Sequence, residues 1–134
     1  MPLSHLYEDL VLDHILGTAT LTFDASVFLA LGSDTTIDKN TFTEITTAGT
    51  NGYDRKAIVF SAAGTDGIAE NAAGTITFGP CATVNWGTLK SFAIFDTITA
   101  GVRIIQGLLT DQTKVVNIGD SATFAAGTVV VTAS

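Results

Sequence analysis

Hydrophobic and polar residues alternate along most of this chain, and the pattern is clearest in the segment Asn85–Asp96. Its sequence, NWGTLKSFAIFD, contains the only tryptophan as its second residue and then places apolar residues on both faces of an alternating run. A strand with two apolar faces needs cover on both sides, so the segment predicts an inner strand of a packed β-structure. The residues expected in the core around it are Trp86, Phe92, Ile94 and Phe95.

The N-terminal segment has a longer period. Between Leu3 and Leu16 apolar residues recur every three or four positions, which predicts an α-helix with Ser4 as its N-cap and Gly17 as its stop. We expect one apolar stripe of the helix to pack on the chain's own sheet. Leu12 and Leu16 fall outside that stripe, which predicts a further contact with a neighbouring subunit. The stripe consists of Leu3, Leu6, Tyr7, Leu10, Val11 and Ile15.

From Ala19 onward the period changes to two, which is typical of short strands. Glycine-containing turns separate the strands, and Ala-Gly-Thr occurs four times among them. The Asp-rich section Gly32–Asn40 is expected to be a surface loop. The predicted strands lie at Thr20, Thr22, Val27–Leu31, Thr41–Thr47, Tyr53–Ser61, Ile68–Asn71, Thr75–Phe78, Leu89–Phe95, Val102–Leu109, Ala122–Phe124 and Val129–Thr132.

This order of elements predicts an all-β fold with one short N-terminal α-helix. Eight or more strands favour a jelly-roll-like β-sandwich, and an immunoglobulin-like β-sandwich is the alternative. We interpret residues 1–134 as a single domain, in which residues 1–17 form the helical segment and residues 18–134 the sandwich. The strand order stays open, because periodicity does not determine which strands pair.

Composition narrows the possible partners. The 134 residues are 46% hydrophobic and only 14% charged, and burying this apolar excess favours a homodimer or homotrimer. A net charge of -7 with six basic residues argues against a nucleic-acid partner, because phosphate neutralisation needs clustered Lys and Arg. No run of about 20 apolar residues is present to span a bilayer, and no basic N-terminal region resembles a secretory signal. We therefore expect synthesis in a cytoplasm and no membrane partner.

The search for reactive or metal-binding residues finds no specific pattern, so the chain is predicted to be neither an enzyme nor dependent on a cofactor or metal. His5 and His14, the only histidines, lie on opposite sides of the predicted helix and cannot chelate one ion. Asp34 and Asp38 have loop spacing but lack the order of a calcium-binding loop. The single cysteine, Cys81, is expected to be a buried thiol.

Five stretches of the chain together resemble a family of small bacteriophage virion proteins. They are SHLYEDLVLDHILG, VFLAL, NGYDRKAIVF, TITFGPCATVNWGTLKSFAIFD and GDSATFAAGTVVVT. Members are often labelled tail fibre proteins, and similar proteins act as capsid cement or decoration proteins. The match covers nearly the whole chain, although Gly32–Asn40, Asp54 and Lys56 depart from the family pattern.

The resemblance implies a non-enzymatic structural role in the virion. We expect a capsid cement or decoration protein that binds across subunits of the major capsid protein on the capsid surface. A tail fibre or tail adaptor component is the alternative. The predicted intersubunit or capsid contact comprises Leu6, Tyr7, Leu12 and Leu16.

Overall fold

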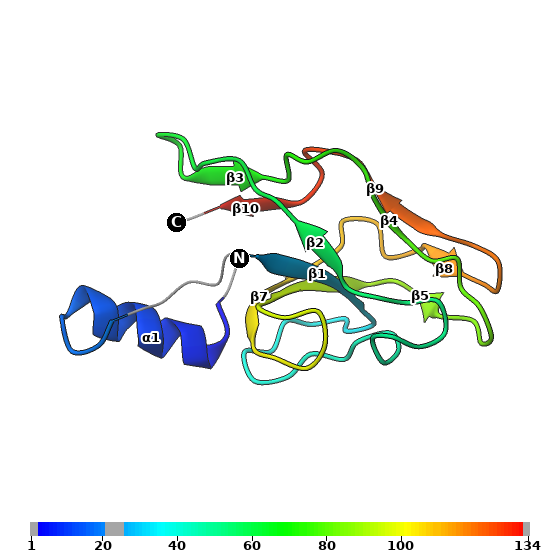
Figure 1. Cartoon of the computed structure of the whole chain (residues 1–134), viewed down its shortest axis with the longest axis horizontal. Helices are drawn as coiled ribbons and strands as arrows, with labels where there is room; N and C mark the ends of the chain where they lie inside the picture. The colour runs from blue at the N-terminus through cyan, green and yellow to red at the C-terminus, as the bar shows by residue number, and fades with distance from the viewer. Residues whose placement is uncertain (1–2, 21–25, 133–134) are drawn as a thin grey trace.

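A four-stranded antiparallel sheet forms the centre of the fold (Figure 1). The computed structural model describes residues 3–20 and 26–132. The strand order in this sheet is β2-β1-β6-β7. The four strands are β1 (Val27–Gly32), β2 (Lys56–Ile58), β6 (Ser91–Phe95) and β7 (Arg103–Leu108).

Three short antiparallel ladders form the second layer, in place of one continuous sheet. Each ladder pairs strands that are distant in the sequence. They are β3 (Ile68–Glu70) with β10 (Val130–Thr132), β4 (Ile76–Phe78) with β9 (Ala122–Phe124), and β5 (Gly87–Thr88) with β8 (Val115–Val116). The prediction of an all-β sandwich with an N-terminal helix is confirmed.

Strand β6 is the inner strand that its two apolar faces predict. All five of its residues are buried, and it pairs with β1 on one side and β7 on the other. In the ladder with β1, Ile94 lies opposite Leu29 and Phe92 opposite Leu31. These four side chains share the face that points into the sandwich, because residues two apart in a strand share a face.

The main core lies between the sheet and the ladders. Aromatic rings form its centre: Tyr53 stacks on Phe78 with 6.0 Å between ring centroids, and Trp86 meets Tyr53 edge-on at 5.6 Å. Trp86 also donates a hydrogen bond from its indole nitrogen to the Asn51 carbonyl at 3.1 Å. The buried members are Leu29, Leu31, Tyr53, Ile58, Phe78, Cys81, Trp86, Leu89, Phe92, Ile94, Val116, Ala122 and Val129.

A smaller core covers the opposite face of the sheet. Ala30, Ala93 and Phe95 are buried there beneath Phe42, which belongs to the irregular segment after β1. Gly32 allows this approach, because a Cβ at that position would lie only 2.5 Å from the Phe42 ring. The loop predicted at residues 32–40 therefore leads into a segment that packs on the sheet.

The strand predicted at Thr41–Thr47 is wrong. The segment contributes only an isolated bridge between Glu44 and Gly32 and otherwise runs irregularly over the sheet. Side-chain contacts hold the segment in place of strand pairing: Phe42 covers the small core, and Glu44 binds a buried arginine, Arg55. Of the remaining predicted strands, Ala122–Phe124 has the observed bounds and most others are longer than observed. Thr20 lies outside any strand, and Thr22 lies outside the described residues.

An ion pair between Arg55 and Glu44 fastens this covering segment. Arg55 is buried and meets the carboxylate through two hydrogen bonds of 3.0 and 2.9 Å. Its guanidinium also lies 3.6 Å from the centroid of the Phe95 ring, and its remaining donors reach the carbonyls of Thr97 and Ala100. Each nitrogen of this buried guanidinium has a hydrogen-bond partner, so Arg55 is a structural residue.

Candidate functional site

Helix α1 (His5–Ile15) leaves the body at the β7 edge of the sheet and lies at one end of the molecule (Figure 1). The attachment begins with a bridge between Leu3 and Ile105, and the Ser4 amide donates to the Ile104 carbonyl at 2.8 Å. A salt bridge from Lys39 to Glu8 continues it. The base of the helix is thus held to the body by backbone and side-chain contacts.

The surface of α1 is unusually apolar for a helix that contains no buried residue. Among the residues predicted to make an intersubunit contact, Leu6, Leu12 and Leu16 are 51%, 55% and 66% exposed, and Tyr7 is half-buried. Ile15 is 72% exposed. The structure therefore places three of the four predicted contact residues on the outside of one short helix.

The prediction that one stripe of α1 packs on the chain's own sheet is wrong. Leu3, Tyr7, Leu10 and Val11 are half-buried, but Leu6 and Ile15 from the same stripe are mainly exposed. The cause is the position of the helix: it projects from the β7 edge of the sheet instead of crossing a face. Periodicity indicates which residues of a helix could be buried together, but it does not indicate the surface on which they pack.

The polar residues of the helix also differ from expectation. Ser4 occupies the N-cap position, but its side chain makes no capping hydrogen bond, and its Oγ is buried without a partner among the described residues. His5 and His14 are both exposed. Asp13 accepts a hydrogen bond from the Thr18 hydroxyl at 3.0 Å, just beyond the helix end.

A second surface feature is a hollow between β2 and β4 that the sequence did not reveal. Its volume is about 210 Å³, and Lys56 lies at its rim with Val59, which is 57% exposed. Among the described residues, none that lines it is acidic. We call it the β2–β4 hollow; its lining residues are Lys56, Ala57, Val59, Asn71, Ala73, Gly74, Thr75, Ile76 and Thr77.

The acidic residues of the loop after β1 form hydrogen bonds within the fold. Asp38 accepts hydrogen bonds from the backbone amides of Asn40 and Thr41, and Asp34 accepts one from Thr43 at 2.7 Å. Within residues 3–20 and 26–132, no group of three or more His, Cys, Asp or Glu side chains has a metal-binding arrangement. No helix in the same ranges is long and apolar enough to cross a membrane.

Tyr53 shows the electrostatics of the buried interior. Its hydroxyl donates to the Glu44 carboxylate at 2.7 Å and accepts the Leu31 amide at 3.0 Å. Burial, and then the hydrogen bond to Glu44, raise the pKa of Tyr53 well above its usual value. Both hydrogen-bond partners of the hydroxyl lie within the core, so the raised pKa belongs to a structural group and marks no reactive site.

These features define a small β-sandwich protein with a projecting N-terminal helix whose surface is apolar. Residues 2–132 match the family Gp80, described as podophage GP4 fiber I protein gp80, and the chain belongs to this family. It is therefore a fibre-related virion protein of a bacteriophage, in agreement with the resemblance seen in the sequence. Comparison with curated proteins gives no match.

Proposed function

We propose that the chain is a non-enzymatic structural subunit of the phage tail fibre and that α1 attaches it to neighbouring protein in the particle. The observation that carries this proposal is an 11-residue helix with no buried residue and with exposed leucines along it. An isolated helix of this length is only marginally stable in water, since most helices depend on tertiary packing. A neighbouring protein would supply that packing.

The fibre assignment takes its support from the family, whose description names a fibre protein. The body suits a passive role as well, because its buried charged pair and its loop carboxylates are engaged in hydrogen bonds within the fold. A sandwich of this kind can serve as a rigid carrier for the helix.

Capsid cement on the major capsid protein is the second candidate. A fibre shaft usually consists of repeats, and the 134 residues contain neither a regular repeat nor heptads. A short domain with a projecting helix could equally clamp two adjacent capsid subunits. In both roles α1 is the attachment element, so the two candidates differ in location and in number of copies.

Copy number in purified virions tests the assignment. Quantitative mass spectrometry against the major capsid protein should give about a dozen copies or fewer for a tail fibre, a small multiple of the tail symmetry. Copy numbers in the hundreds would reject the fibre role in favour of capsid cement. Absence of the chain from purified particles would contradict both.

A further inference from the structure

We propose that α1 of one copy docks into the β2–β4 hollow of a second copy, so that the subunits associate head to tail. This inference rests on the proposed function and deepens it, because it names both the partner of the helix and the receiving surface. It starts from two surfaces of the same chain: a helix face with leucines and carboxylates, and a hollow whose lining combines apolar side chains, polar side chains and one lysine.

The helix face carries two carboxylates beside its two outer leucines. At 100° per residue, Asp9, Leu12, Asp13 and Leu16 share one side of α1. Neither Asp9 nor Asp13 has an ion-pair partner within the described part of the chain, whereas Glu8 is already paired with Lys39. A surface that receives this face therefore needs apolar floor and a positive charge beside it.

The β2–β4 hollow has both properties. Val59 and Ile76 contribute apolar surface, and Lys56 has no ion-pair partner among the described residues. Its volume of about 210 Å³ is below the roughly 300 Å³ at which small-molecule pockets begin, so it suits one or two inserted side chains. Leucine side chains from α1 have the size and polarity to fill it.

A larger groove along β8 and β9 is a poorer acceptor. Its lining includes Leu89, Leu109 and Phe124, but also Asp111 and Asp120 against a single lysine, Lys114. The excess of negative charge would repel the acidic face of α1, because like charges brought together at an interface are unfavourable. The larger groove has more apolar side chains, so it is the charge of the lining that favours the β2–β4 hollow as the acceptor.

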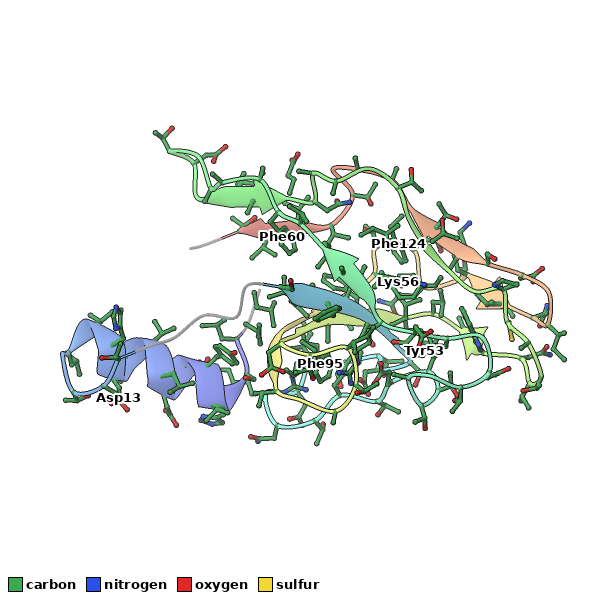
Figure 2. All side chains as sticks on the ribbon, viewed as in Figure 1. Asp13, Tyr53, Lys56, Phe60, Phe95 and Phe124 are labelled. Atoms are coloured by element: carbon green, nitrogen blue, oxygen red, sulfur yellow. The ribbon has the colours of Figure 1, made fainter. Side chains whose placement is uncertain are left out.

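The positions of the two surfaces make the contact directional. Helix α1 is attached at β7, while the hollow adjoins β2, and these strands are the opposite edges of the four-stranded sheet. Figure 2 shows Asp13 at the outer end of α1 and Lys56 on β2 in the middle of the molecule. Donor and acceptor therefore belong to different copies, and each copy can both give and receive a helix. Such a heterologous contact closes into a ring when the rotation between subunits permits.

Complementation between two variants tests the pairing. The donor variant Leu12→Ser/Leu16→Ser keeps an intact hollow, and the acceptor variant Lys56→Glu/Val59→Ser keeps an intact helix. In sedimentation velocity of the full chain at tens of micromolar, we expect the wild type to associate and each variant alone to bind at least about tenfold more weakly. Mixed, the two variants should form a 1:1 dimer that does not grow further, since one working contact remains.

Several outcomes would overturn the inference. A wild type that stays monomeric would do so, as would an acceptor variant that associates like the wild type, or a mixture in which both variants remain monomers while their melting curves show them folded. Val115→Ser, on the rim of the larger groove, is the matched control; loss of association in this variant would assign the acceptor to that groove.

A charge exchange keeps the test valid if the acceptor variant does not fold. Lys56→Glu alone and Asp9→Lys/Asp13→Lys alone should each weaken association, and the combination in one chain should restore it. Failure of restoration in a folded triple variant would contradict the pairing. A monomeric chain that is nevertheless found in virions would leave the proposed fibre role standing and remove only the self-docking.

Discussion

Strand β6 and helix α1 are both rich in apolar residues, yet the fold treats them in opposite ways. Every residue of β6 is buried, and none of α1 is. The strand lies between two partners in the sheet and between two packed layers, whereas the helix touches the body mainly at its base. The same hydrophobic composition therefore contributes to folding in one region and remains available for assembly in the other.

The difference shows that apolar residues stabilise the fold only where the chain itself buries them. Burial inside the chain stabilises the native state by about 25 cal/mol for each Å² of apolar surface removed from water. In a single copy, the exposed leucines on α1 contribute little of this stabilising free energy. They would contribute more when a partner protein covers them. Three variants separate the two roles.

The largest effect is expected in the strand. Phe92→Ala should lower the free energy of unfolding by about 3 to 5 kcal/mol, because it removes a buried ring from the centre of the sheet and leaves a cavity. Urea unfolding measures the loss. Val84→Ala, at a residue that is 67% exposed, is the control and should change it little. A loss below about 1 kcal/mol for Phe92→Ala would contradict the placement of this ring in the core.

An intermediate effect is expected at Tyr53. Tyr53→Phe should cost about 1 to 2 kcal/mol near neutral pH, because the Leu31 amide and the Glu44 carboxylate each lose a partner. The substitution should also change the alkaline behaviour. Tyr53 keeps its proton in the folded state above pH 10, where tyrosine in the unfolded chain loses it at a pKa of about 10. The unfolded state then binds fewer protons, so wild-type stability should fall as the pH rises above about 10.

Urea unfolding at pH 9 and pH 11 tests that behaviour. The fall for this one group approaches about 1.4 kcal/mol per pH unit, and Tyr53→Phe should lack this component. Other groups contribute equally to both proteins, so the difference between the two slopes isolates Tyr53. Equal alkaline slopes would contradict the raised pKa.

The smallest effect on stability is expected in the helix. Leu12→Ser/Leu16→Ser should change the free energy of unfolding of the dilute, unassembled chain by less than about 0.5 kcal/mol, as is usual for exposed sites. Incorporation of the same variant into virions should drop clearly in competition with the wild type, measured by mass spectrometry. A variant that unfolds would show that both leucines belong to the core. The helix and β6 would then have the same role in folding.

Local patterns predicted the central parts of this fold well. The alternation in residues 89–95 indicated a covered strand, and the period of three to four in residues 3–16 indicated a helix; both are present. Ala122–Phe124 has its predicted bounds. These features depend on neighbours within a few residues, so the sequence contains the information directly.

The parts that failed depend on residues far apart in the chain. The segment around Glu44 has the alternating pattern of a strand, but it is held by the pair between Glu44 and Arg55, and no local pattern shows that pairing. Likewise, the apolar stripe of the helix predicts burial but does not show which surface would cover it. The helix is attached at Ile105 on the edge of the sheet, and this position leaves much of the stripe exposed. The β2–β4 hollow was missed for the same reason, since Lys56 and Ile76 meet only after the two layers pack.

The pairing of distant strands also has a consequence for how the chain acquires its structure. Phe28 lies opposite Phe95, Ile76 opposite Phe124, and Glu70 opposite Val130. Contacts between residues so far apart in the sequence form only after a large loop has closed, and closing that loop costs conformational entropy. Proteins dominated by such contacts fold in milliseconds to seconds. The helix, with its local contacts, can form in about a microsecond. During synthesis the early apolar strands therefore stay unpaired until the later strands have been made. Contacts between nascent chains in this interval can lead to misassembly in competition with folding.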